Sequence, residues 1–78
     1  MEKLLNQLKP EAEGRVVEIF SQGPLRQKLL GMGIVKGTSV EVTDIAPLGD
    51  PIGIRVKGYR LSLRKEEASQ ILVKVNEQ

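Results

Sequence analysis

The chain contains no cysteine and no histidine, and these two absences remove most of the small sites used for catalysis or metal binding. Without cysteine there is no disulfide, no thiolate nucleophile and no cysteine-ligated zinc or iron–sulfur cluster. Without histidine there is no Ser/His/Asp triad and no imidazole ligand for a metal. We therefore predict that the protein is not an enzyme and has no catalytic residues.

Aromatic residues and long apolar runs are scarce as well. Phe20 and Tyr59 are the only aromatic residues of the sequence, which argues against a nucleic-acid binder that stacks bases and against an aromatic groove for proline-rich peptides. No window approaches the roughly 18 apolar residues of a membrane span, and residues 1–10 lack the apolar run of a signal peptide. We expect a cytoplasmic protein.

The 78 residues that are present suit one small globular domain, residues 1–78. Hydrophobic residues make up 40% of the chain, enough for a core of aliphatic side chains. The charge is uneven, because residues 1–50 carry six basic and seven acidic side chains whereas residues 51–78 carry six and three. The basic C-terminal part makes a small nucleic-acid-binding β-barrel the alternative function, and a solvated surface is its simpler explanation.

The first half of the chain predicts a strand followed by a helix. Leu4, Leu5 and Leu8 have helical spacing ahead of Pro10 and predict a short turn that packs on the body of the domain. Residues 15–20 are rich in β-branched side chains and predict the first strand, with Val17 and Ile19 on one face. Residues 25–30 predict a helix that begins at Pro24 and ends at the following glycines.

The second half predicts short strands at close intervals. Apolar side chains alternate with polar ones in residues 39–43 and 52–57, a tight turn at residues 57–59 leads into residues 60–63, and a one-turn helix at residues 65–68 precedes a last strand at residues 71–75. This pattern is typical of an all-β fold, a small SH3-like β-barrel of about five strands.

The same alternation predicts which side chains form the core. The expected buried residues are Val17, Ile19, Leu29, Met32, Ile34, Val40, Val42, Ile54, Leu61, Leu63, Ala68, Ile71 and Val73.

Two surface features are candidates for binding. The loop of residues 46–51 contains two prolines, which stiffen it, and Leu48 at its tip is either a lid on the core or an exposed anchor for a partner. Basic side chains would form a patch if they shared a face: Arg55, Lys57, Arg60, Arg64 and Lys65.

Only carboxylates remain as metal ligands, and a solubilising surface is their simpler role. Those nearest to clustering in the sequence are Glu18, Glu41, Asp44, Asp50, Glu66 and Glu67. Carboxylates without imidazole or thiolate favour hard cations over selective transition-metal binding, so we predict no cofactor and no dedicated metal site.

The order of the segments resembles the FeoA family over nearly the whole chain. The specific parts are the helix with its Gly-x-Gly end in residues 28–37 and the Pro-Leu-Gly-Asp-Pro loop in residues 47–51. Residues 58–64 and 67–73 add support. Two positions depart from the family pattern: Glu11, where the family often has glycine, and Lys28, where it usually has arginine.

The resemblance implies a small cytosolic SH3-like β-barrel that accompanies FeoB, the membrane ferrous-iron transporter with a cytosolic GTPase domain. It implies a role in iron uptake by protein–protein interaction, and the family is also associated with transition metals. Since this chain offers only carboxylates as ligands, we predict no dedicated iron site, with weak Fe²⁺ binding at most. As the contact surface we predict Leu25, Arg26, Leu48 and Asp50, presented by the helix and the stiff loop.

Overall fold

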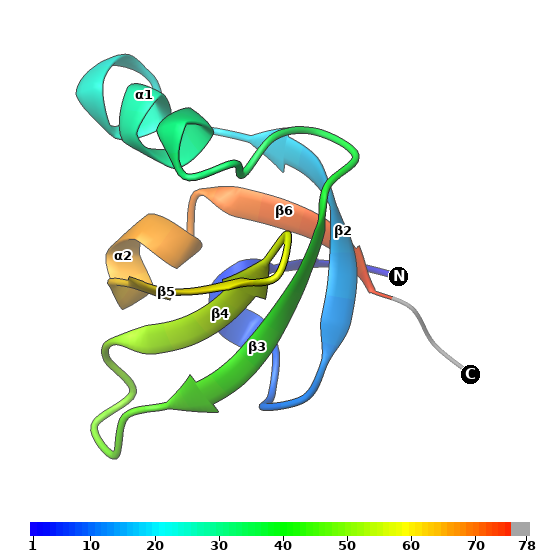
Figure 1. The fold of residues 1–78 in the computed structure, drawn as a ribbon, viewed down its shortest axis with the longest axis vertical. Coiled ribbons are helices and arrows are strands. Elements are labelled where there is room, and N and C mark those ends of the chain that lie inside the picture. The colour runs from blue at the N-terminus through cyan, green and yellow to red at the C-terminus, as the bar shows by residue number, and fades with distance from the viewer. Residues whose placement is uncertain (76–78) are drawn as a thin grey trace.

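The computed structural model describes residues 1–75, which form six strands and three short helical segments (Figure 1). In chain order these are β1 (Glu2–Leu4), the 3-10 helix η1 (Leu5–Gln7), β2 (Glu13–Ile19), α1 (Gly23–Gly31), β3 (Ser39–Ile45), β4 (Ile52–Val56), β5 (Tyr59–Leu63), α2 (Lys65–Ala68) and β6 (Ile71–Val75). The all-β prediction is confirmed, and so are the two short helices.

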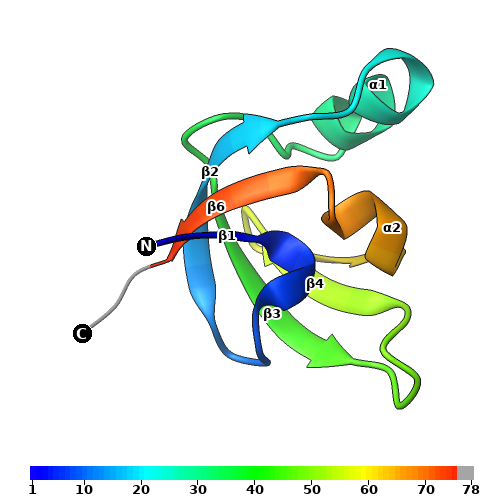
Figure 2. The same cartoon turned by 180° about the vertical axis from the view of Figure 1, so that it is seen from behind.

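The strands form one antiparallel sheet in the order β1-β6-β2-β3-β4-β5. The sheet curls around its core, but β1 and β5 are its two ends and do not pair with each other, so the term barrel applies only loosely. The sheet has one strand more than the five predicted. The additional strand is β1, which lies beside β6 (Figure 2).

Local backbone chemistry sets the ends of the main elements. Pro24 stands in the first turn of α1, and beyond the helix Gly33 takes a φ of 87°, where glycine is favoured. Between β4 and β5 the two turn residues Lys57 and Gly58 both have positive φ, 52° and 84°. Positive φ at both positions is the geometry of a type I′ turn. The tight turn predicted at residues 57–59 is therefore confirmed.

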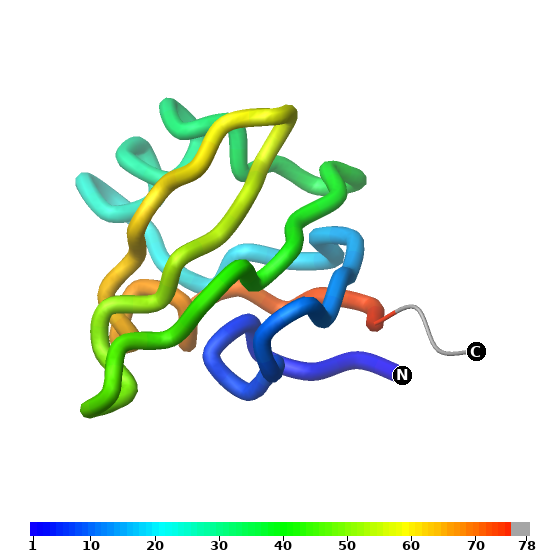
Figure 3. Tube along the Cα trace, turned by 60° about the horizontal axis from the view of Figure 1, so that its bottom comes forward, coloured from blue at the N-terminus to red at the C-terminus, as the bar shows by residue number. Residues whose placement is uncertain are grey.

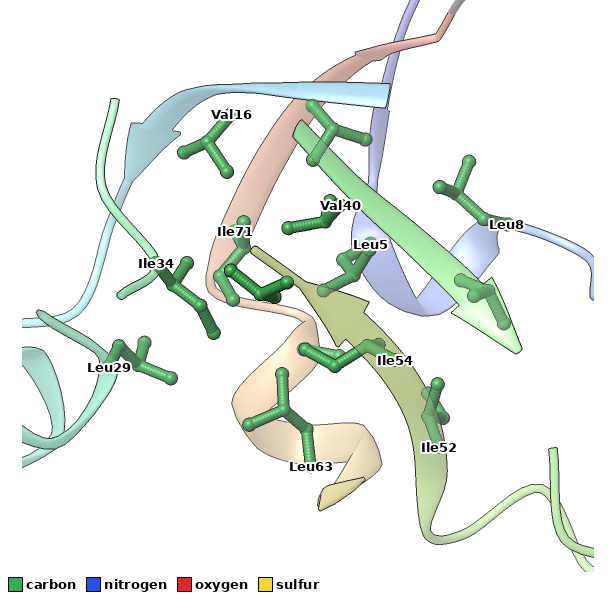
Figure 4. Packing of buried hydrophobic residues seen from close by; sticks show 14 of the residues in the cluster. Leu5, Leu8, Val16, Leu29, Ile34, Val40, Ile52, Ile54, Leu63 and Ile71 are labelled. Carbon is green, nitrogen blue, oxygen red and sulfur yellow. The ribbon is translucent and has the colours of Figure 1, made fainter. Parts of the chain in front are cut away.

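The core is a single aliphatic cluster enclosed by the curled sheet, α1 and η1 (Figure 4). Its buried members are Leu5, Leu8, Val16, Ile19, Leu29, Ile34, Val40, Val42, Ile52, Ile54, Val56, Leu63, Ala68, Ile71 and Val73. The early leucines of the sequence therefore pack on the core, as predicted. Three expected core residues are not buried: Val17, Met32 and Leu61 are only partly covered.

A β-bulge in β2 explains the error at Val17. Val16 pairs with Val73 and Glu18 pairs with Leu72, so Val17 is an extra residue without a partner in β6. The bulge shifts the side-chain alternation by one position, and Val16 and Ile19 both face the core. The other two lie at margins of the core: Met32 follows α1, and Leu61 lies on the edge strand β5.

Candidate interaction cleft between α1 and α2

A cleft of about 430 Å³ opens where α1, α2, β5 and the loop between β3 and β4 meet. We call it the α1–α2 cleft. It is lined by Lys28, Asp50, Pro51, Ser62, Leu63, Arg64 and Glu67.

Glu67 organises this cleft. Its Oε2 lies 2.6 Å from Lys28 Nζ on α1, and its Oε1 accepts a hydrogen bond of 2.8 Å from the backbone N–H of Arg64. The side chain of Glu67 is only 12% exposed, whereas that of Lys28 is 53% exposed. A buried carboxylate is stable only when its oxygens are satisfied, as they are here. Glu67 thereby links α1 to the start of α2.

The same contacts lower the pKa of Glu67. The hydrogen bond from Lys28 is the main cause and the N–H of Arg64 the second, while burial acts in the opposite direction. The pKa in the folded state thus lies below the unfolded value. The resulting stabilisation is present above the unfolded pKa, near 4.5, and is lost as the pH falls through the folded pKa.

We predict that Glu67→Gln makes the stability less dependent on acid. Glutamine has nearly the same shape as glutamate but cannot ionise. The variant therefore lacks the stabilisation that the ionised Glu67 gives the folded wild-type protein at pH 7, and it has none to lose when the pH falls. Melting temperatures from pH 7 down to pH 3 should fall more steeply in wild type than in the variant. Glu66→Gln is the matched control, because no side-chain hydrogen bond or ion pair of Glu66 occurs within residues 1–75. Equal slopes for wild type and Glu67→Gln would contradict the assignment.

Asp50 fastens the loop between β3 and β4 to the other side of the cleft. Its Oδ1 accepts a hydrogen bond of 3.0 Å from the backbone N–H of Lys65, the first residue of α2. N–H groups in the first turn of a helix have no partner inside the helix, so a carboxylate there satisfies one of them. The β3–β4 loop is therefore fastened to the first residue of α2.

The arrangement is suited to binding. Both carboxylates of the cleft are engaged with N–H groups or an ammonium group, so neither is held ready as a general base. Lys28 and Arg64 supply positive charge, and Leu63 and Pro51 supply apolar surface. Five of the seven lining residues are polar or charged, so the cleft suits a polar or charged segment of a partner protein better than an apolar ligand.

The structure places the four predicted contact residues in different surroundings. Leu25 is half-buried and packs on the core, and Arg26 donates a hydrogen bond of 3.1 Å to the carbonyl of Ile19. Leu48 is 95% exposed at the tip of its loop, so the lid alternative is wrong, and the anchor alternative stays a prediction. Of the four, only Asp50 lines the α1–α2 cleft. The helix α1 and the loop tip lie at opposite ends of the molecule (Figure 1).

Arg26 instead lines a second cleft at the start of α1, together with Glu18, Phe20 and Ser21. Glu18 accepts a hydrogen bond from the N–H of Ile19 and pairs with Lys36 at 3.5 Å. The hydrogen bond first and the charge of Lys36 next lower the pKa of Glu18. The Glu18 carboxylate is therefore ionised and paired at neutral pH.

On the strands β3, β4 and β5, basic and acidic side chains alternate on the surface. Arg55 lies 3.1 Å from Glu41 and Arg60 lies 3.3 Å from Asp44, so the predicted basic patch contains acidic partners. Within residues 1–75 no three acidic side chains come together as a metal site would require. No helix in that range has the length and apolar character needed to cross a membrane.

The fold defines a class of protein: a small SH3-like β domain, here with a cleft between α1 and α2 on its surface. The chain belongs to the FeoA family, because the model of the FeoA domain matches residues 3–75. The family is linked to ferrous-iron transport, and the resemblance seen in the sequence is confirmed.

Three similar proteins illustrate the relationship. A fusion of Fe(2+) transport protein A with the Fe(2+) transporter FeoB, from Porphyromonas gingivalis (strain ATCC BAA-308 / W83), is 35% identical over 71 residues. These cover 91% of this chain but only 8% of the fusion protein. The NMR structure of a FeoA-like protein from Clostridium acetobutylicum is 42% identical, with a TM-score of 0.90 over 99% of this chain and 90% of that one. Stenotrophomonas maltophilia FeoA complexed with zinc, called a procaryotic SH3 domain protein, is 26% identical, with a TM-score of 0.80 over 95% and 89% of the two chains.

Proposed function

We propose that this protein is a cytosolic accessory protein of ferrous-iron uptake that docks on the cytosolic region of the FeoB transporter. The observation that carries the proposal is the Porphyromonas gingivalis fusion, in which a domain 35% identical to this chain is part of the same polypeptide as FeoB. Fusion keeps a binding domain at a high effective concentration near its target. Docking of a FeoA domain on the transporter requires a binding surface on the domain itself.

Two surfaces of this chain support docking. Leu48 is a large apolar side chain held in water by a loop that Asp50 fixes to α2. Apolar anchors on rigid supports bind at low entropic cost, because little motion is lost on association. The α1–α2 cleft adds charge and apolar surface beside the fixed end of the loop.

We predict that Leu48→Asp weakens binding to the soluble cytosolic region of the transporter about tenfold or more, as loss of a central apolar anchor does. Biolayer interferometry with the purified region, with and without nucleotide, measures this. Phe20→Asp is the comparison variant for the loop, since it also removes an exposed apolar side chain but lies before α1, in the second cleft with Arg26. Weaker binding by Leu48→Asp than by Phe20→Asp assigns the contact to the loop.

Absence of binding by the wild-type protein in both nucleotide conditions would contradict the proposed function. Equal binding by wild type and Leu48→Asp would show that the loop is not the contact. Arg26→Glu tests the helix end in the same assay, whereas a Leu25 variant would be confounded because Leu25 packs on the core.

A further inference from the structure

The strand β5 is an open edge of the sheet. It pairs with β4 on one side, and the sheet ends there (Figure 3). The other end of the sheet is β1, which pairs only with β6. An edge strand presents backbone N–H and C=O groups that another strand can pair with.

The hairpin register shows which groups these are. Val56 and Tyr59 flank the two-residue turn, and in a type I′ hairpin this pair exchanges hydrogen bonds. Bonded and non-bonded pairs alternate along an antiparallel ladder, so the pair Ile54 and Leu61 is bonded as well. The N–H and C=O of Arg60 and Ser62 therefore point away from β4. Within residues 1–75 none of these four groups has a backbone partner in another element.

The α1–α2 cleft adjoins the C-terminal half of this edge strand. Ser62 and Leu63 of β5 line it, together with Arg64 and with Lys28 of α1. An added strand runs about 4.8 Å from its neighbour. The cleft of about 430 Å³ has room for a few residues of such a strand.

The charge of β5 indicates what kind of strand fits. Arg60 and Ser62 of β5 and Arg64, the extended residue that follows it, are at alternate positions, so they share one face, and all three are exposed. Within residues 1–75 Arg64 has no ion pair, and the pair of Arg60 with Asp44 joins side chains that are 68% and 64% exposed. An exposed pair of this kind is weak and exchanges readily with a new partner.

A second copy of this chain is a poor occupant for the same reason. Two β5 strands paired edge to edge would gather the Arg60 and Arg64 side chains of both copies on one face of the junction. Like charges facing each other across strands destabilise the pairing. A strand with carboxylates at alternate positions reverses the sign of this interaction.

We propose that β5 receives an extended acidic segment of the partner protein as an additional strand, with its carboxylates facing Arg60 and Arg64. The proposal rests on the proposed docking to the transporter and names the kind of segment that docks. Backbone hydrogen bonds to Arg60 and Ser62 hold the segment, and the two arginines select it by charge.

The test uses three variants and the cytosolic region of the transporter. The double variant Arg60→Glu/Arg64→Glu should weaken binding about tenfold or more by reversing the charge of the edge. The control Lys3→Glu/Lys74→Glu changes the net charge equally on β1 and β6, at the far end of the sheet, and should bind as wild type does. Ser62→Pro removes one outward N–H while sparing the bonds to β4, and it should weaken binding similarly.

Hydrogen exchange of the ¹⁵N-labelled wild-type protein gives a direct reading that needs no variant to fold. The amides of Arg60 and Ser62 should exchange at least tenfold more slowly in the complex. If wild type binds but these amides and the double variant are unaffected, the β5 proposal is overturned and the docking proposal stands. If wild type does not bind, both are overturned. Slowed exchange at these amides in a dimer of the protein alone would identify a second copy as the occupant and would overturn the acidic-segment proposal.

Discussion

Replacing Leu29 with alanine is expected to remove about 2 to 5 kcal/mol of folding free energy, a large share of what a small domain possesses. Leu29 is fully buried and is the one buried residue of α1. Its side chain joins the helix to the core, so truncation leaves a cavity that the short helix can close only by moving (Figure 4).

Thermal unfolding followed by circular dichroism measures the effect. For a domain of this size each 1 kcal/mol lowers the melting temperature by about 4 to 8 °C, so a shift of about 10 °C or more is expected. Leu48→Ala is the matched control, since that leucine is 95% exposed and its loss should change the melting temperature little. A melting temperature unchanged by Leu29→Ala would show that α1 does not pack as described.

The second large effect is expected at Gly14, where even one added methyl group has no room. A Cβ built on Gly14 would lie 2.9 Å from the carbonyl oxygen of Lys74 and 3.2 Å from the side chain of Val73. Both neighbours belong to β6, whose backbone is fixed by pairing with β1 and β2. Gly14→Ala should therefore destabilise the protein by about 1 to 3 kcal/mol, the usual cost of overpacking.

Gly53 on β4 provides the contrast. A Cβ there would also meet close neighbours, but they are the ends of the Thr43 and Asp44 side chains. The side chain of Asp44 is 64% exposed and can rotate into water, at the expense of a surface ion pair with Arg60 and an exposed hydrogen bond from Thr43, which both contribute little. Chemical denaturation of the two variants should show Gly53→Ala within about 0.5 kcal/mol of wild type. Equal losses of unfolding free energy in the two variants would contradict this account, because they would mean that the backbone of β6 moves aside as easily as a surface side chain.

The elements that follow local chemistry were predictable. The turn at Lys57 and Gly58, the proline start of α1 and the alternation in β4 depend on neighbours in sequence, and each was found where expected. The bulge at Val17 and the pairing of β1 with β6 depend on distant strands. Local patterns contain no information on such pairings, which is why Val17 was assigned to the core in place of Val16.

The candidate site was predictable only in part. Asp50 was expected from its stiff loop and does line the α1–α2 cleft. Lys28 and Glu67 were missed as a pair because 39 residues separate them and only the fold brings them together. One signal was available for Glu67: it stands three residues after Arg64, the position from which a glutamate side chain reaches back to the residue before a helix.

The pairing of β1 with β6 also determines how the domain responds to tension. The N–H of Val75 donates a hydrogen bond to the carbonyl of Met1, so the start of β1 lies beside the end of β6 (Figure 2). Force applied between Met1 and Val75 would act on this ladder at one end and break its bonds one after another, as a zipper opens. Strands pulled in opposite directions along their length resist better, because all of their bonds are loaded at once. Along this axis the β1–β6 ladder is mechanically soft and opens first, until the buried Leu5 and Leu8 side chains that follow β1 hold the chain to the core.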